Sequence, residues 1–382
     1  ALSSTAELPP FDNSAMDGFA LATAGAGALA DSEHVVSSSV AAGQDAAATA
    51  TGTAWEVMTG AAVPVNADTV VPIEQVQILE HDGEHPSRIR LRQSVPLGQH
   101  MRRRGEDVSL HERVIDAGTP LRGAHLMLLA GLGCACVQVV RRPRVALIAT
   151  GRELIGDAAQ ALQPGQIRDG TSSYLLSQLR AAGAQLVWHG QVGDDDVAFD
   201  AALSQVRSAG ADLILSTGAV SRGRYDFLPD ALARHAAQLL FHKVAVRPGK
   251  PVLLARFGDG ALYVGLPGNP MASAAGLRFF VEPALRGLMG MPVERGLRVA
   301  LATPMQARPM WRQHLRARLL YSAVGALSVQ VLPQQESFRV MPLLRANAWA
   351  VLEPQHEGAA PATHANVFGL GHLQPAAPAI AP

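Results

Sequence analysis

The stretch DLILSTGAVSRGRYD, residues 212–226, decides the fold of this chain. Its first residues, 212–215, form a short apolar run that is typical of a buried strand in a parallel sheet. The loop that follows is small and polar, so a ligand can approach its backbone closely. Its N–H and hydroxyl groups suit an anion. The residues that make this loop are Ser216, Thr217, Gly218, Ser221 and Gly223.

Two further glycine-rich turns follow. FHKVAVRPGKP, residues 241–251, carries the cations Lys243, Arg247 and Lys250, and GLPGNP, residues 265–270, directly precedes a helix-like segment. In an open α/β sheet such turns meet at the carboxyl edge of the strands, where phosphate ligands bind. A single turn of this kind is explained as well by tight chain reversal. Three on one edge, with Lys and Arg between them, favour a phosphate site.

Strands and helices alternate from Arg144 onward. VALIATG, LVWHGQV and DLILSTG are predicted strands, and the segments between them are predicted amphipathic helices. This order predicts a doubly wound parallel sheet with right-handed crossovers. Carboxylates recur where the strands end, and beside cationic loops they match what a metal–phosphate site requires. These carboxylates are Glu153, Asp169, Asp194 and Asp226.

The flanking regions have a different pattern. Short alternating runs between turn residues, from Glu33 to Gly98 and again after Met291, predict two small β domains. We therefore expect an α/β multidomain fold with these parts: linker or dimerisation segments at 1–22 and 99–142, a small β domain at 23–98, the α/β domain at 143–290, a C-terminal β domain, barrel-like, at 291–372, and a loose tail at 373–382. The opening ALSSTAELPP also reads as a segment that need not fold.

Two polar loops near the start have two explanations each. FDNSAMDG brings Asp12 and Asp17 around one turn, either as a local Asx-turn or as part of a site. RRRGED, with Asp107, is either a self-paired surface cluster or part of a site. Thr59 likewise stands at a hairpin corner or in a site.

GAHLMLLAGLG reads as a short helix that leads into a strand, CACVQVV. In that strand Cys134 and Cys136 would share one face. Neighbours of this kind make a poor disulfide and, without further ligands, a poor zinc site. We expect both cysteines to lie in the core.

Composition excludes some partners. The 382 residues carry 32 Lys plus Arg and 32 Asp plus Glu, so no net charge attracts nucleic acid or an anionic membrane. No apolar run reaches the roughly 18 residues that span a bilayer. We expect small-molecule substrates and a cytoplasmic location.

The motifs FDNSAMDGFA, VMTGAAVP, RRRGEDV, TGREL, STGAVSRG, RPGKP and LPGNP, in this order, closely resemble the molybdopterin molybdotransferase family, called MoeA in bacteria and related to the gephyrin E domain. The resemblance covers nearly the whole chain. It implies an elongated homodimer whose MogA-like α/β domain binds the pterin, with possible contact to a MogA-like protein. It also implies that molybdate and adenylylated molybdopterin are converted to molybdenum cofactor and AMP, with Mg2+ or another divalent cation.

The resemblance carries roles to individual residues by motif. Expected catalytic residues are Asp12, Thr59, Asp107, Glu153, Asp194 and Asp226. Expected substrate-binding residues are Ser216, Gly218, Ser221, Lys243, Arg247, Lys250, Pro267, Pro270, Arg316 and Ser337. Asp226 is the expected metal ligand.

The chain departs from the family pattern at four positions. Ala219 replaces a Gly, Arg224 an acidic residue, Arg247 a Lys and Thr171 an Asn. Metal ligation by the central loop therefore depends on Asp226 alone. The family usually begins earlier, with a helical segment that we expect to be absent here. Two alternatives remain: a non-catalytic molybdopterin-binding or scaffold protein, and a MogA-like molybdopterin adenylyltransferase, which would not need the flanking β domains.

Overall fold

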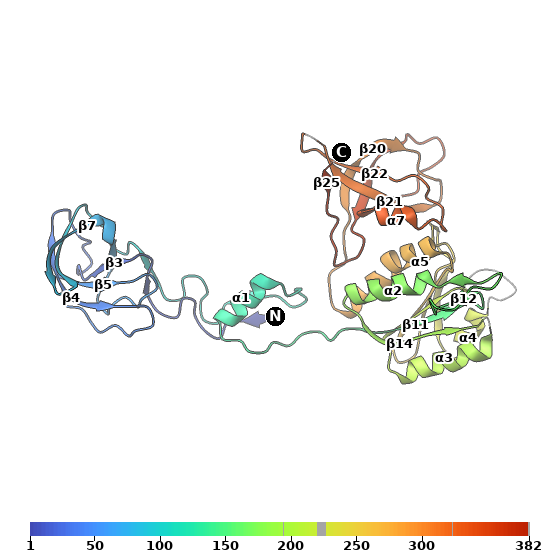
Figure 1. The fold of residues 1–382 in the computed structure, drawn as a ribbon, viewed down its shortest axis with the longest axis horizontal. Helices are drawn as coiled ribbons and strands as arrows, with labels where there is room; N and C mark the ends of the chain where they lie inside the picture. Colours follow the sequence, from blue (N-terminus) through green and yellow to red (C-terminus); the bar gives the residue numbers. More distant parts are fainter. Residues whose placement is uncertain (194, 220–226, 323, 381–382) are drawn as a thin grey trace. The chain divides into compact units, whose positions relative to one another are not determined.

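The structure is a computed structural model that describes residues 1–193, 195–219, 227–322 and 324–380. The chain divides into two compact units, Ala1–Gln138 and Val139–Pro382 (Figure 1). Each unit has its own hydrophobic clusters. Within the described part of the chain, no helix is long and apolar enough to cross a membrane.

Unit 1 is built on a six-stranded sheet in the order β6-β3-β5-β4-β8-β7. Strand alternation divides its side chains between two cores: Phe19 and Leu21 enter one, and Ala20 enters the other. The sheet begins at Gly18, earlier than the expected boundary at residue 23. Its elements are β3 (Gly18–Leu21), β4 (Glu33–Val40), β5 (Thr53–Val57), β6 (Thr69–Pro72), the 3-10 turn η1 (Ile73–Gln75), β7 (Val76–Asp82) and β8 (His85–Leu91).

The beginning of the chain, predicted as a segment that need not fold, is paired with later strands. β1 (Leu2–Ser3) pairs with β10 (Arg113–Ile115), and β2 (Asn13–Ser14) pairs with β9 (Met101–Arg102). The Leu8 N–H also donates to Val108 O at 2.9 Å. Partners about a hundred residues away supply these hydrogen bonds, and local composition does not reveal them.

The segment after β10 was predicted in part. The predicted helix is present as α1 (Gly123–Gly131). The strand predicted after it is absent: residues 134–143, all described, form no strand. Cys134 is half-buried and Cys136 exposed, so the expected core position is also wrong. An alternating sequence becomes a strand only beside a partner, and within the described chain this segment has none.

The α/β domain of unit 2 has the predicted doubly wound sheet, but the sheet is mixed and not parallel throughout, because β18 runs antiparallel to β19 and β16. Its order is β14-β11-β15-β19-β18-β16, and β11 lies parallel to both β14 and β15. The chain order therefore reverses beside β11, which makes the β11–β15 boundary a topological switch point. The strands are β11 (Arg144–Thr150), β14 (Gln185–Val192), β15 (Leu213–Thr217), β16 (Gln238–His242), β18 (Leu253–Arg256) and β19 (Leu262–Leu266), with the small pair β12 (Leu154–Ile155) and β13 (Ile167–Arg168) beside them.

Helices cover both faces of this sheet, with α3 and α4 on one side and α2 and α5 on the other (Figure 1). Phe199 and Leu203 of α3 pack in one cluster, and Leu175 and Leu179 of α2 in the opposite one. Asp169 caps α2 by accepting from Ser172 N at 2.9 Å, so it has a structural role. The helices are α2 (Gly170–Ala181), α3 (Asp196–Ser208), α4 (Leu228–Arg234), α5 (Pro270–Gly276), the π-helical η2 (Leu277–Val281) and α6 (Glu282–Leu288).

The C-terminal domain is a closed five-stranded barrel. Its strands follow the order β21-β22-β20-β24-β23, and β23 pairs back with β21. Closure leaves no free edge. The strands and helix are β20 (Leu297–Met305), β21 (Arg312–Tyr321), β22 (Leu327–Val331), α7 (Met341–Arg345), β23 (Ala348–Leu352) and β24 (Ala362–Phe368). Two outer strands, β17 (Val246–Arg247) and β25 (Ala379–Ile380), also pair with β21.

The expected loose tail is therefore attached over its described residues. Leu320 pairs with Ala379, and Asn347 Nδ2 donates to Ala377 O at 2.9 Å. Proline-rich composition predicted a segment without helix or strand, yet main-chain N–H and C=O groups between the prolines remain available for pairing.

Helix α5 joins the barrel to the α/β domain. Met271, Ala274 and Ala275 of α5 surround Trp349 of β23, and the Met271 N–H donates to Ser337 O at 2.9 Å. This packing brings the LPGNP turn next to the loop that contains Ser337.

Candidate functional site

The first part of the site is the switch point of the α/β sheet. Thr150 Oγ1, at the end of β11, donates to Thr217 O at 2.7 Å. Gly218 follows with φ 85°, and a Cβ there would lie 2.6 Å from Thr150 Oγ1. The Gly218 N–H donates to Leu266 O at 3.0 Å, which ties the turn to the end of β19. Three parallel strands thus end together, and their close approach requires glycine at position 218.

Glu153 lies just after β11 on an exposed turn. Its carboxylate covers Gly151, where an added Cβ would be 2.7 Å from Oε2. Gln191 Nε2 holds this turn by donating to Leu154 O at 2.6 Å. Among the described residues no three His, Cys, Asp or Glu side chains group as they do around a metal ion. Asp194, Ser221 and Asp226 lie outside the described residues.

Ser216 is directed into the core. It is fully buried, and its Oγ accepts from the hydroxyl of Tyr263 at 2.5 Å. In this arrangement its hydroxyl supports the sheet beneath the loop.

Beside the switch point lies a cavity of about 450 Å³, which we call the first cavity. Three segments form its wall: the RPGKP loop, the LPGNP turn and the barrel loop before α7. Four of the expected substrate-binding residues line it, namely Arg247, Lys250, Pro267 and Ser337. The structure thus brings together residues up to 90 positions apart in the chain.

The first cavity is cationic. Lys243 and Lys250 are the only lysines in the chain, and all other basic side chains with a permanent charge are arginines. Lys250 is exposed, and its Nζ lies 5.2 Å from the centroid of the Trp311 ring. That contact positions the ammonium group by cation–π attraction. One carboxylate, Glu336, also lines the cavity, and it pairs with Arg339 at 3.1 Å.

Arg316 lies behind this cavity without lining it. Its side chain is 0% exposed. Nη2 donates to Gln334 O at 2.9 Å, while Nε and Nη1 have no hydrogen-bond partner in the described chain. Burial lowers the pKa of the guanidinium, and nearby Glu336 opposes this. Arg247 and Lys250 line the cavity and Arg316 lies behind it, while the lining carboxylate Glu336 is paired with Arg339, so positive charge is in excess around the cavity.

Two further expected residues, Lys243 and Pro270, also do not line this cavity. Lys243 is half-buried, with φ 71°, and its N–H donates to Val252 O at 3.0 Å. A left-handed backbone is uncommon for lysine. Pro270 is the first residue of helix α5. An N–H at this position would have no acceptor within the helix, so proline fits there.

In unit 1 the first loop meets the RRRGED loop. Asp12 accepts from Arg103 Nη1 and from the Arg104 N–H, both at 2.7 Å. Partial burial raises the pKa of the Asp12 carboxyl. The Arg104 N–H and the Arg103 guanidinium lower it by more than burial raises it, so the pKa lies below the usual value. Asp107 is exposed on the same loop, and its N–H donates to Leu8 O at 2.9 Å.

Thr59 joins the same neighbourhood through Asp17. Its N–H and Oγ1 donate to Asp17 Oδ1 at 2.6 and 2.8 Å. These two bonds lower the pKa of the Asp17 carboxyl. Gly60 N donates to Ser14 O at 2.8 Å. Asp12, Thr59 and Asp107 therefore stand on segments that converge within unit 1.

Sequence reasoning missed several residues that line the first cavity. Asn269 lies inside the quoted LPGNP motif. Trp311 follows irregular chain, and Gln335 and Glu336 directly precede Ser337. Trp311 had one signal in the sequence: tryptophan is rare in this chain, which has four.

Three family profiles match consecutive parts of the chain. The MoeA N-terminal region (domains I and II) matches residues 1–133, the probable molybdopterin binding domain matches residues 146–287, and the MoeA C-terminal region (domain IV) matches residues 298–368. Together they span most of the sequence.

Individual relatives agree with these profiles. A molybdopterin molybdenumtransferase of Synechococcus elongatus is 34% identical over 378 residues, 97% of this chain and 90% of the relative. A molybdopterin molybdenumtransferase 2 of Mycobacterium tuberculosis is 37% identical over 332 residues, 84% and 79% of the two chains. The crystal structure of a molybdopterin biosynthesis MoeA protein from Pyrococcus horikoshii aligns with a TM-score of 0.79 at 25% identity, over 96% of this chain and 89% of that one.

Proposed function

The chain belongs to the MoeA family of molybdopterin molybdenumtransferases, and from this premise we propose that it inserts molybdenum into molybdopterin. It takes adenylylated molybdopterin and molybdate, and it releases molybdenum cofactor and AMP. The non-catalytic scaffold and the adenylyltransferase are not favoured, since relatives over nearly the full length are named as molybdenumtransferases.

The observation that carries this proposal is the first cavity with Arg316 behind it. Molybdate is a tetrahedral dianion, and the excess of positive charge around the cavity suits it. Buried guanidinium N–H groups without partners raise the energy of the protein until an acceptor reaches them. Nε and Nη1 of Arg316 are such groups. Lys250, Ser337 and Arg316 would therefore hold molybdate, with Arg247 beside them.

The adjoining switch point would hold the pterin substrate. Its turn at Gly218 exposes backbone near the ends of β11, β15 and β19, where phosphate ligands bind in sheets of this type. The diphosphate would then lie beside the molybdate cavity. Positioning both substrates by charged donors lowers the barrier mainly by orientation and charge neutralisation.

A divalent cation, Mg2+ or a similar ion, is part of the proposal. Asp226 would be its protein ligand, and Asp194 and Glu153, which follow predicted strands in the sequence, are further candidates. Of these three residues only Glu153 lies in the described chain, and its exposed carboxylate suits a hard cation. When bound, the cation would neutralise charge on the diphosphate.

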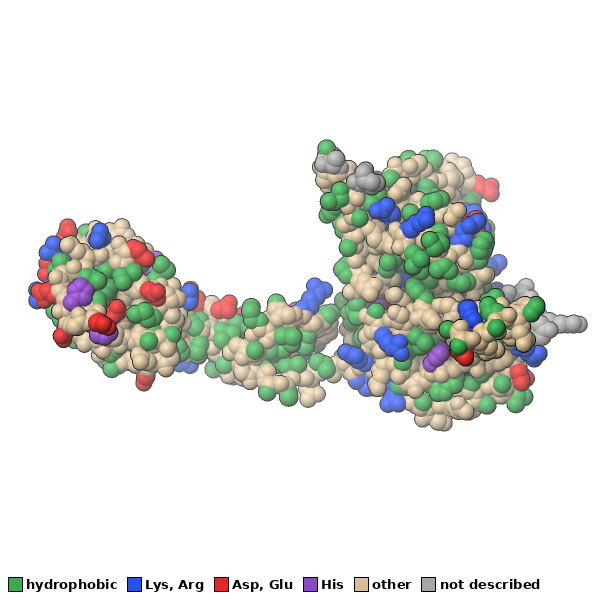
Figure 2. Space-filling model, in the orientation of Figure 1, with side chains coloured by type: hydrophobic (Ala, Val, Ile, Leu, Met, Phe, Trp, Pro, Cys, Tyr) green, Lys and Arg blue, Asp and Glu red, His purple; other side chains and the backbone are tan. Residues whose placement is uncertain are grey.

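We also propose a homodimer in which unit 1 contributes Asp12, Thr59 and Asp107. Leu126 and Met127 of helix α1 are 59% and 77% exposed, and few charged side chains surround α1 (Figure 2). Exposed apolar side chains on one helix are typical of an interface. Contact with a MogA-like protein and a cytoplasmic location stay predictions.

The test is AMP release from adenylylated molybdopterin, with and without molybdate. The proposal expects AMP only when molybdate is present, with no consumption of ATP. ATP-dependent formation of the adenylylated pterin would instead support the adenylyltransferase. Tight pterin binding with no AMP in either case would support the scaffold.

A further inference from the structure

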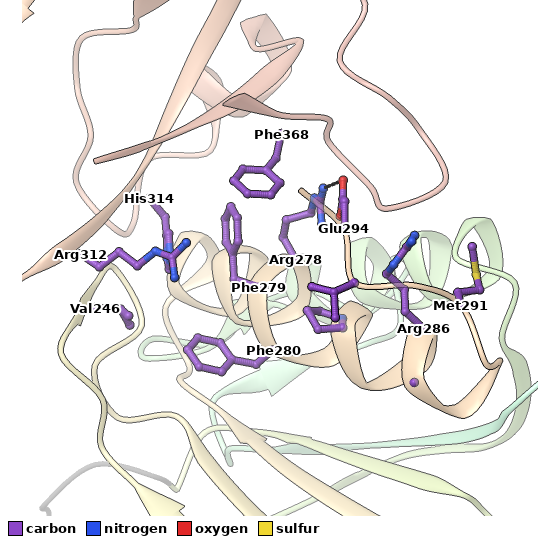
Figure 3. A pocket seen from close by; sticks show the side chains of 13 residues that line it. Val246, Arg278, Phe279, Phe280, Arg286, Met291, Glu294, Arg312, His314 and Phe368 are labelled. Atoms are coloured by element: carbon purple, nitrogen blue, oxygen red, sulfur yellow. Dashed lines mark hydrogen bonds and ion pairs between the residues drawn. The ribbon is translucent and has the colours of Figure 1, made fainter. Parts of the chain in front are cut away.

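A second cavity, of about 300 Å³, lies in unit 2 between the helical segment η2–α6 and the barrel (Figure 3). Phe279, Phe280 and Pro283 come from the helical side, and His314 and Phe368 come from the barrel. Of the described lining residues, Val246 is the only one that it shares with the first cavity. The second cavity is therefore a separate site, and none of the residues assigned to the reaction lines it.

Aromatic rings form one end of the second cavity. The Phe279 ring stacks on the His314 ring, with centroids 4.0 Å apart and an angle of 12°. It also meets Phe368 edge to face, at 5.6 Å and 90°. Phe279 and the next residue, Phe280, both line the cavity because they lie in the π-helical turn η2, a feature frequent at functional sites. Such walls suit a flat ring, which gains from stacked and edge contacts.

His314 adds an unsatisfied polar group at this end. Its side chain is 1% exposed, and its Nδ1 has no hydrogen-bond partner among the described residues. Burial, with the nearby Arg312, lowers the pKa of the imidazole to about 3. The ring is therefore neutral, so one nitrogen donates and the other accepts. A bound ring that carries a polar atom can therefore also hydrogen-bond to Nδ1, in addition to its stacking contacts.

The charges point to an anionic ligand. Three guanidiniums line the cavity, and two have an ionised carboxylate partner: Arg278 pairs with Glu294 at 2.6 Å, and Arg312 pairs with Glu353 at 3.2 Å. Glu282 also lies 3.2 Å from Arg278, but burial raises the pKa of its carboxyl to about 8, so it is largely protonated at neutral pH. Arg286 bonds only to neutral groups in the described chain, donating to Pro292 O at 2.9 and 2.5 Å. In Figure 3 it lies at the end of the cavity away from His314. One positive charge therefore remains without a counter-ion.

We propose that the second cavity binds a small monoanion with a flat aromatic or heteroaromatic ring. The ring would lie among Phe279, Phe280 and Phe368, and the anionic group would bind Arg286. The volume is at the lower end of ligand pockets, about 300–1,000 Å³, which fits a bicyclic carboxylate. This site is independent of molybdenum insertion, so its test measures binding without turnover.

The probe is 2-naphthoate, compared with the neutral 2-naphthylmethanol, in calorimetric titrations of the full chain. We expect naphthoate to bind at least roughly tenfold more tightly, because an uncompensated guanidinium is a charge-assisted donor. Arg286→Met should reduce that preference to near unity. The matched control is Arg318→Met, a half-buried arginine of β21 that lines neither cavity.

A blocking variant tests the location. Gly287 lines the cavity on the same helix face as Pro283, and a Cβ added there meets no atom within 4 Å. Gly287→Leu should fold, since glycine is a poor helix former, and it should weaken naphthoate binding at least roughly tenfold. Gly287→Ala, which adds one methyl group, should bind nearly as the parent does.

Three results would overturn the proposal. Equal binding of naphthoate and naphthylmethanol would show that the site does not recognise the anionic group. Undiminished binding to Gly287→Leu would show that the probe binds outside the second cavity. Loss of binding in Lys250→Met would assign the probe to the first cavity. If Gly287→Leu did not fold, Arg286→Met against Arg318→Met would decide.

Discussion

Arg316 and Gln335 hydrogen-bond to each other twice. The Arg316 N–H donates to Gln335 Oε1 at 3.1 Å, and Gln335 Nε2 donates to Arg316 O at 2.9 Å. This pair fixes the barrel loop against strand β21, so that Ser337 faces the first cavity while the guanidinium of Arg316 stays buried behind it. The geometry is prepared for an anion before any anion is bound.

Arg316→Met should separate stability from anion binding. Removing a buried charge without a carboxylate partner is expected to leave the free energy of unfolding unchanged or raise it by about 1 kcal/mol or more. Molybdate at about 100 times its Kd should stabilise the parent by about 2.7 kcal/mol, but it should scarcely stabilise the variant. Thermal unfolding with and without molybdate measures both effects. Arg318→Met is the control, and an equal molybdate shift in all three proteins would remove Arg316 from the site.

Ala219→Gly should stabilise the chain. Ala219 has φ 51°, in the left-handed region where a Cβ is unfavourable. Relief of this strain exceeds the added freedom of glycine in the unfolded chain, so we expect a gain of about 0.5–1 kcal/mol. The control is Ala209→Gly. Ala209 ends helix α3 in a right-handed backbone conformation, with φ −71°, so this substitution should lower stability. Chemical denaturation measures both, and a loss in Ala219→Gly would contradict the strained conformation.

His314 should make stability depend on pH. Its folded pKa of about 3 lies below the unfolded value of about 6.5, so below pH 6.5 the unfolded chain binds more protons. The contribution of His314 to the free energy of unfolding is complete above pH 6.5. It falls as the pH decreases toward 3, by up to about 1.4 kcal/mol per pH unit. His314→Phe, which cannot take up a proton, should lose less stability than the parent between pH 7 and 5. If the free energy of unfolding of the parent and of His314→Phe changed equally with pH, His314 would not be held neutral in the folded chain.

Mixed dimers test whether the units of two chains share a site. Asp12→Asn and Asp226→Asn should each be inactive alone, because each removes a charge from the proposed centre. If one chain supplies Asp12 and the other Asp226, each heterodimer has one intact site, so about half of the sites in heterodimers isolated through both tags should be active. AMP release from co-expressed variants, isolated with two different tags, measures this. Inactive heterodimers would indicate a site built within one chain.

Local sequence signals predicted the α/β domain correctly. Apolar runs such as residues 212–215 need only neighbours of the same kind to form a parallel sheet, and glycine follows where the chain must turn tightly. Arg247, Lys250 and Pro267 line one cavity because the RPGKP and LPGNP segments adjoin strands that pair with each other, β18 and β19. Short stretches of sequence are therefore enough to predict the α/β domain and these lining residues.

Long-range pairing accounts for what sequence reasoning missed. Trp311 and Glu336 reach the first cavity because β17 pairs with β21 and the barrel closes. The tail at Ala379 pairs with Leu320 for the same reason. Ser216 lies in a strand buried on both faces, so its inward direction cannot be inferred from alternation. Residues 134–143 alternate like a strand, but no described partner lies beside them.

Whether molybdate binds in the first cavity is decided by a molybdate titration of AMP release at fixed adenylylated molybdopterin, with the parent, Lys250→Met and Arg256→Met. Arg256 is an exposed cation of β18 that lines neither cavity. We expect Lys250→Met to raise the molybdate concentration for half-maximal release by roughly tenfold or more, about 1.4 kcal/mol, and Arg256→Met to match the parent. If Lys250→Met also matched the parent, molybdate would not bind in the first cavity.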